Sequence, residues 1–169
     1  MRARRTWLMI ACLLGASSQL AAATGSRSIM DPSWVVVPGK AVGPIRIGMS
    51  QEQVRAAVGE AEQTSLGGWE YPAGGYAVLF DKDRHIVDAI VAGDAGSPHG
   101  PLVKAFVART PEGIGMGSTR TEVLKALGEP TADKKPLGGG EVLSYQGLDL
   151  MLVDWAVAHL TVWKASKYR

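Results

Sequence analysis

The sequence has very little cysteine and no long apolar run. Its 169 residues include one cysteine, Cys12. The apolar stretch near the N-terminus covers residues 7–15, and Ser17 and Ser18 interrupt the pattern soon afterwards. A helix that spans a bilayer needs about 18 or more apolar residues, so this stretch is too short for a retained transmembrane anchor.

The order of residues at the N-terminus is typical of an export signal. Three arginines within residues 2–5 precede the apolar stretch, and Ala21–Ala23 supplies the small residues that signal peptidase recognises. We therefore predict a signal peptide over residues 1–23, cleaved near Ala23, and a periplasmic or secreted mature protein.

The alternative to a cleaved soluble protein is a lipoprotein. Met9–Cys12 would then be the lipobox and Cys12 the acylated residue. This reading leaves almost no hydrophobic region before the cysteine. We therefore expect no stable membrane anchor.

Cleavage of the signal peptide changes the composition of the working molecule. Without Arg2, Arg4 and Arg5, the 18 basic residues fall to 15, against 16 acidic residues. A near-neutral chain lacks the basic patch expected of a nucleic-acid-binding protein, so we expect no nucleic-acid partner. The loss of Cys12 also excludes a disulfide, a zinc-thiolate cluster and a catalytic thiol.

The mature region contains an internal repeat. Residues 48–61 (GMSQEQVRAAVGEA) and 117–130 (GSTRTEVLKALGEP) share five identities in fourteen positions. Ser50 with Gln53, and Thr119 with Glu122, form the capping-box pattern that begins a helix. Apolar residues follow at helical spacing in both copies, and a glycine suited to end a helix follows them.

Three strands are expected after each helix, with glycine-rich breaks and Asp-containing turns between elements. The expected strands are Trp69–Tyr71, Gly75–Phe80 and Arg84–Val91 in the first copy, and Val142–Tyr145, Leu148–Val153 and Trp155–Trp163 in the second. The sequence thus predicts an α+β fold of two tandem repeats, each a helix or short helical pair packed on a small antiparallel sheet. The expected divisions are an N-terminal extended segment at 24–41, repeat 1 at 42–91, a linker at 92–101 and repeat 2 at 102–169.

The motifs of the repeat resemble a known family. An alternating Ile-x-Ile-Gly-Met segment, a capped helix that ends in Val-Gly-Glu or Leu-Gly-Glu-Pro, and a Tyr-bearing meander cover most of residues 42–163. This pattern resembles the BamE (SmpA/OmlA) and β-lactamase-inhibitor-protein superfamily, whose members act by binding other proteins. The BamE-type proteins carry a lipid anchor, for which Cys12 is a poor candidate, and the inhibitor protein has disulfides, which a chain with one cysteine cannot form. No partner-contacting residue can be transferred.

No pattern in the mature region predicts catalysis. His85, His99 and His159 are scattered and match no metal-ligand spacing. Asp81 and Asp83 fall where a hairpin turn is expected, and turns favour aspartate. The glycines of residues 113–117 lack a phosphate-binding pattern. We predict no catalytic residues, no metal site and no cofactor, and hence no enzyme; an enzyme would need a cleft that gathers His85 or His159 with a carboxylate.

The last two expected strands carry a candidate binding face. If Leu148, Leu150 and Leu152 point inward, the opposite side mixes tryptophan and methionine with polar groups, a composition typical of interfaces. The candidate residues of this face are Asp149, Met151, Trp155, His159, Thr161 and Trp163. The structural interpretation, in which the tryptophans cover the sheet or pack between the repeats, stays open.

Two binding functions follow from these observations. The first is an exported, non-catalytic protein-interaction module whose partner is another envelope or secreted protein. The alternative is a binder of a small molecule, glycan or cell-wall fragment, with aromatic side chains as stacking platforms. The residues for that alternative are Trp69, Tyr71, Tyr76 and Tyr145.

Overall fold

The structure is a computed structural model that describes residues 31, 33–65, 68–83, 85–93, 106–136 and 139–165. The predicted signal peptide, most of the predicted linker and His99 lie outside the described residues. No helix in the described part of the chain is long and apolar enough to cross a membrane.

The main element is an eight-stranded antiparallel sheet with the strand order β4-β5-β6-β7-β11-β10-β9-β8. Its strands are β4 (Gln63–Ser65), β5 (Gly68–Tyr71), β6 (Tyr76–Phe80), β7 (Val87–Gly93), β8 (Ala132–Lys134), β9 (Glu141–Tyr145), β10 (Leu148–Val153) and β11 (Ala156–Trp163). The two helices are α1 (Gln51–Val58) and α2 (Arg120–Leu127). A second, three-stranded sheet consists of β1 (Val36–Val37), β2 (Ala41–Val42) and β3 (Ile45–Arg46).

The expected fold of two helix-on-sheet repeats is wrong. The protein is mostly antiparallel sheet, and the strands of both copies belong to one sheet because β7 pairs directly with β11. The central pairs of this junction are Val91 with Thr161 and Ile90 with Val162. Without this pairing, both strands would present a row of unpaired backbone groups, so joining them satisfies both edges. Only the coarser α+β description remains, since the chain contains both helices and strands.

The predicted helix ends are confirmed. Ser50 accepts a hydrogen bond from the backbone of Gln53, whose side chain in turn accepts one from the Ser50 backbone at 2.9 Å. Thr119 and Glu122 form the same reciprocal pair. Gly59 and Gly128 end α1 and α2 with positive φ angles of 87° and 78°, a conformation that glycine adopts without steric cost.

The two copies also share one backbone arrangement that joins the segment before each helix to the sheet. Val87 begins β7 at a register shift and exchanges backbone hydrogen bonds with Gly48 and Met49. Val157 of β11 lies at a corresponding register shift and exchanges such bonds with Gly117 and Ser118. Each helix therefore begins at a fixed place relative to the first residues of the last strand in its copy.

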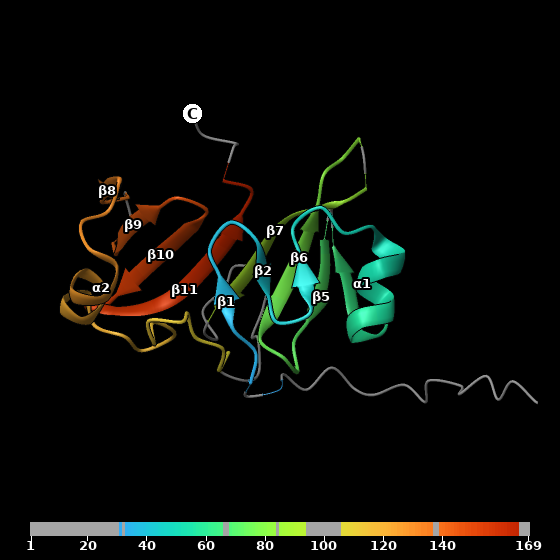
Figure 1. Cartoon of the computed structure of the whole chain (residues 1–169), viewed down its shortest axis with the longest axis horizontal. Coiled ribbons are helices and arrows are strands. Elements are labelled where there is room, and N and C mark those ends of the chain that lie inside the picture. Colours follow the sequence, from blue (N-terminus) through green and yellow to red (C-terminus); the bar gives the residue numbers. More distant parts are fainter. Residues whose placement is uncertain are drawn as a thin grey trace, which may run out of the picture.

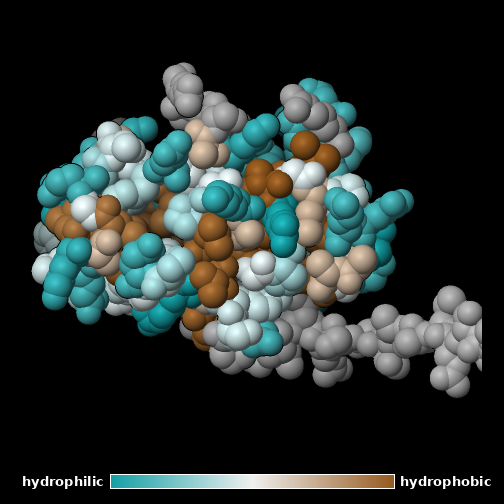
Figure 2. All heavy atoms as spheres, viewed as in Figure 1, coloured by the Kyte–Doolittle hydropathy of each residue, from teal (hydrophilic) through white to brown (hydrophobic). Residues whose placement is uncertain are grey.

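One face of the sheet carries the core. Val54 of α1, Val123 of α2 and Ile45 of β3 are fully buried, and they belong to one cluster with the inward side chains of the sheet. Figure 1 shows the helices near the two ends of the sheet and β1 and β2 in front of its middle. Figure 2 shows an apolar stripe over β1 in this view. Val35, which precedes β1 in the chain, is 42% exposed. Both helices and the small sheet thus cover the same face.

Candidate binding surface

The other face of the eight-stranded sheet is the candidate binding surface, and we call it the open face. Residues directly opposite each other on neighbouring strands point to the same side of a sheet, so the pairings define its members. Its middle row crosses all eight strands: Gln63, Glu70, Ala77, Val91, Thr161, Asp149, Ser144 and Ala132. A flanking row contains Gly93, His159, Met151, Val142 and Lys134, and the other contains Leu79, Ala89 and Trp163.

Burial distinguishes the open face from the core face. In β11, Leu160 and Val162 are at most 1% exposed, whereas the intervening Thr161 and the terminal Trp163 are only half-buried. Within the described ranges, the buried cluster that includes both helices and β1–β3 lies on the core face. The open face therefore presents an extended, partly exposed surface of mixed apolar and polar side chains.

Five of the six candidate residues of the predicted face come together. Asp149 lies opposite Thr161, and Met151 lies opposite His159, on β10 and β11. Trp163 is on the same face, one row further along β11. All five are half-buried.

Trp155 does not belong to the open face. It lies in the two-residue turn between β10 and β11, is 78% exposed and has a φ of 69°, while Asp154 before it has a φ of 51°. The predicted alternation along β11 also fails at Val157, which is 2% exposed and pairs with Leu152. The register shift beside Met151 causes this, because an extra residue in β11 reverses the alternation at its start.

The predicted stacking platform is mostly internal. Tyr71 and Tyr76 are 0% exposed, and their rings stack on each other with centroids 4.9 Å apart. Trp69 packs edge-on against Phe80 at 4.9 Å, and the Arg55 guanidinium lies 5.0 Å from its ring centroid. Tyr71 and Tyr76 thus have no surface to offer a ligand.

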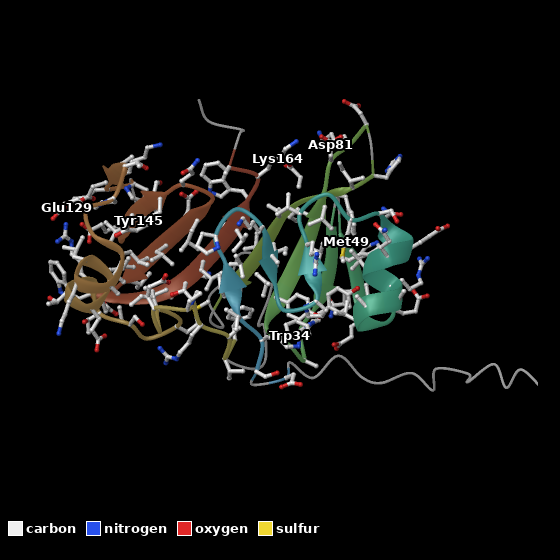
Figure 3. The ribbon with its side chains drawn as sticks, in the orientation of Figure 1. Trp34, Met49, Asp81, Glu129, Tyr145 and Lys164 are labelled. Carbon is white, nitrogen blue, oxygen red and sulfur yellow. The ribbon has the colours of Figure 1, made fainter. Side chains whose placement is uncertain are left out.

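Two of the tyrosines donate hydrogen bonds to the C-terminal ends of the helices. The Tyr71 hydroxyl donates a hydrogen bond to the carbonyl of Gly59 at 3.2 Å, and the Tyr145 hydroxyl donates one to the carbonyl of Gly128 at 3.0 Å. Burial, followed by the nearby Glu60 carboxylate, raises the pKa of Tyr71 to about 12. Burial also raises the pKa of Tyr145, which lies near Glu129 at the α2 end of the molecule (Figure 3). Each tyrosine therefore serves as a donor to a free helix-end carbonyl.

The histidines and aspartates form no catalytic cluster in the described residues. His85 is exposed at the β6–β7 turn, and Asp81 there accepts a hydrogen bond from the Asp83 backbone at 3.0 Å. His159 is on the open face. The described part of the chain contains no group of three or more His, Cys, Asp or Glu placed to hold a metal ion.

A pocket of about 550 Å³ opens beside Asp149, and we call it the Asp149 pocket. Its lining residues are Thr131, Ala132, Lys134, Ser144, Tyr145, Gln146, Asp149, Trp163 and Ala165. The Asp149 Oδ1 atom is buried and has no hydrogen-bond partner. The sequence identified Asp149 and Trp163 as face residues and Tyr145 as a stacking residue, but it missed Ser144 of β9 and the residues of β8, which only the strand register brings to this place.

A larger hollow of about 640 Å³ lies between α2 and the segment before it. Two of its four charged lining residues are already engaged: Arg109 donates to the Gly113 carbonyl at 2.9 Å, and Glu122 completes the helix cap, while Glu112 and Lys125 also line the hollow. Because Arg109 and Glu122 already bond to their own loop and helix, they offer few free hydrogen-bonding groups to a ligand. The Asp149 pocket is therefore the better candidate site.

Comparisons with known proteins give one similar structure. No family model matches the chain, and no curated protein matches it. The chain is similar to the crystal structure of a DUF4309 family protein (YjgB) from Bacillus subtilis, with 19% identity, a TM-score of 0.48, and coverage of 75% of this chain and 88% of that chain.

The resemblance to the BamE and β-lactamase-inhibitor-protein superfamily is wrong as a family prediction. The similar structure belongs to the DUF4309 family, and no family model supports the predicted one. The residues that carried the resemblance are the helix caps and the core positions of the repeat, which many small α+β domains need.

Proposed function

We propose that this chain is an exported, non-catalytic protein-interaction module that binds another envelope or secreted protein through the open face. The observation that carries the proposal is the middle row of this face, which crosses all eight strands. Six of its eight side chains are half-buried, whereas Gln63 is exposed and Glu70 is buried. A surface of this breadth offers contacts to a partner rather than a confined reaction site.

The composition of the open face supports a protein partner. Trp163 and Met151 are residue types enriched at interface centres, and Thr161 and Ser144 add hydrogen-bonding groups between them. The first half of the sheet carries smaller side chains on this face, which project less far from the strands: Ala77, Ala89 and Val91. A partner can therefore pack closely on one half and find larger side chains on the other.

A charged substitution at the centre of the face tests this proposal. Val91 pairs with Ala77 and Thr161, so Val91→Arg places a long cation in the middle of the surface. Tagged wild type and variant would be purified from the native envelope with their partners. The matched control is Thr121→Arg, which adds the same charge on the exposed side of α2.

The expected result is a protein retained by wild type and Thr121→Arg and lost with Val91→Arg, while thermal unfolding shows that all three are folded. The same partners on folded Val91→Arg would rule out the open face as the docking surface. The alternative function, a small-molecule, glycan or cell-wall-fragment binder, is favoured only by the Asp149 pocket with Tyr145 and Trp163 in its wall. Thermal stabilisation by sugars or muropeptides, with unchanged partners on Val91→Arg, would favour it.

Export by residues 1–23 has its own test. Mass spectrometry of protein from the extracytoplasmic fraction should give an N-terminus at or close to Thr24. Cys12→Ala should leave location and mass unchanged apart from any uncleaved precursor. A lipid-modified N-terminus at Cys12 would establish the lipoprotein alternative instead.

A further inference from the structure

We infer that the Asp149 pocket receives a basic side chain, lysine or arginine, from the protein that docks on the open face. This inference rests on the proposed function and adds the chemistry of one contact. It is carried by a carboxylate with an unsatisfied oxygen, an aromatic ring in the same wall, and the charge of the surrounding row.

The Asp149 carboxylate lacks a hydrogen bond that a basic group could donate. A buried carboxylate oxygen normally accepts hydrogen bonds, and the Asp149 Oδ1 atom has none. Asp149 also lines the pocket, and the terminal torsion of an aspartate is soft, so a small rotation presents either oxygen to the cavity. An ammonium or guanidinium group entering the pocket would supply the missing donors with a charge-assisted bond.

The pocket also has the size for such a side chain. Its volume of about 550 Å³ lies in the range of pockets that enclose small organic groups, so it has room for a long side chain. Trp163, which lies on the open face with Asp149, is also among its lining residues. An aromatic face beside a carboxylate favours a cation with an apolar stem, because the ring attracts the charge and covers the methylene groups.

The charge of the open face also favours a cation. Asp149 is the half-buried carboxylate of the middle row, Glu70 in the same row is buried, and the row contains no lysine or arginine. Lys134 also lines the pocket, but it is exposed on the edge strand β8 and lies one row away from Asp149. Its flexible stem allows the ammonium to point into water, whereas Asp149 is held in the sheet.

Short peptides provide the direct test. The probes are acetyl-Gly-Arg-Gly-amide and acetyl-Gly-Lys-Gly-amide, with the acetyl-lysine and glutamate forms as neutral and acidic counterparts. Each is titrated into the full mature chain while the indole N–H resonances are followed by NMR, and Trp163→Phe identifies the Trp163 resonance. We expect the basic peptides to shift it and the two counterparts to bind at least about tenfold more weakly.

Variants then assign the effect to Asp149. Asp149→Asn keeps the shape and removes the charge, and it should lower affinity for the basic peptides about tenfold. Asp154→Asn is the matched control, because Asp154 is exposed at the far end of the same strand pair. If Asp149→Asn fails to fold, the acetyl-lysine comparison on wild type still decides, since it changes only the peptide.

Equal binding of basic, neutral and acidic peptides, or full affinity in folded Asp149→Asn, would overturn the inference. The partner experiment separates it from the proposed function. If Val91→Arg loses the partner but Asp149→Asn still captures it fully, the proposed contact with a basic side chain is wrong and the open-face function stands. If Val91→Arg retains the partner, the partner does not dock on the open face, and the basic-side-chain contact has no basis either.

Discussion

The imidazole of His159 lies over Gly93. The two residues face each other across the β7–β11 junction, and a Cβ atom added at Gly93 would collide with the Nδ1 atom of His159. The histidine therefore occupies the space that the glycine leaves at the centre of the sheet. This contact joins the last strands of the two copies.

Gly93→Ala is expected to lower the free energy of unfolding by about 1–3 kcal/mol, because the new methyl group displaces the imidazole. The matched test is the double variant with His159→Ala, which removes the obstructing ring. Denaturant unfolding should show that Gly93→Ala costs much less in that background. An equal cost in both backgrounds would mean that the backbone, not His159, opposes the substitution.

The turn between β10 and β11 is expected to become more stable when Trp155 is replaced by glycine. Asp154 and Trp155 both have positive φ, a conformation that costs most residues about 1–2 kcal/mol and glycine little. Allowing for the entropy of glycine in the unfolded chain, Trp155→Gly should raise the free energy of unfolding by about 0.5–1 kcal/mol. Trp155→Ala, which keeps the Cβ atom, should change it little; a loss in both variants would show that the indole packs favourably.

Tyr71→Phe is expected to lower the free energy of unfolding by about 1 kcal/mol, since it removes the hydroxyl that donates to the Gly59 carbonyl. Tyr145→Phe makes the corresponding change at Gly128, where the tyrosine is half-buried, and should cost less. Denaturant unfolding at neutral pH measures both. A larger loss at Tyr145 would contradict the burial argument.

Tyr71 also predicts a loss of stability at high pH. Its pKa is about 12 in the folded chain against an ordinary value of 10.0, so the folded state binds the phenolic proton more tightly. This contribution is complete below pH 10 and is lost as the pH rises from about 10 to about 12. The stability of Tyr71→Phe should decline less over this interval than that of wild type, and parallel curves would contradict the assignment.

Arg120→Met is expected to lower the free energy of unfolding more than the loss of an exposed ion pair does, because Arg120 pairs with both Glu141 and Asp133. Its guanidinium contacts both carboxylate oxygens of Glu141 at 3.0 and 3.1 Å, and the Glu141 side chain is only 12% exposed. The control is Glu60→Gln, which breaks the pair with Arg55 at 2.7 Å, where both side chains are well exposed; it should cost less than about 1 kcal/mol. Equal losses would show that burial of Glu141 does not matter.

The helix ends could be predicted because their cause is local. The Ser50 side chain and the Gln53 backbone lie three residues apart, so the cap is visible in the sequence itself. The pairing of β7 with β11 has no comparable signal. Ladder hydrogen bonds join backbone atoms, and Val91 and Thr161 would suit many other neighbours equally well.

The residues of the candidate face could be predicted wherever side chains alternate regularly between the two faces of a strand. Asp149 and Met151 fall on one side of β10, and Thr161 and Trp163 fall on the matching side of β11. The bulge near Val157 could not be predicted from the sequence. One extra residue in β11 hardly changes the composition, but it reverses which face of the sheet the side chains before it point to. Val157 was misplaced for this reason, and Trp155 because it lies in the turn before β11 rather than in the strand.

The aromatic residues show a different limit. Tyr71 and Tyr76 pair with each other across β5 and β6, and this cross-strand contact places both rings in the core. A tyrosine in a strand can cover a core or serve a ligand, and its neighbours in space decide between them. Ser144 and Thr131 were missed in the Asp149 pocket because their position depends on the pairing of β8 with β9 and β10.

The strand order also determines how the sheet resists aggregation. Its two outer strands, Gln63–Ser65 and Ala132–Lys134, have three residues each, while the two at its centre have seven and eight. Short, polar borders offer little template for a further strand from another molecule. A truncation after Gly93 would reverse this order and expose a seven-residue, largely apolar border. Such a fragment is expected to pair with copies of itself along this border, so the pairing of β7 with β11 protects the chain against self-association.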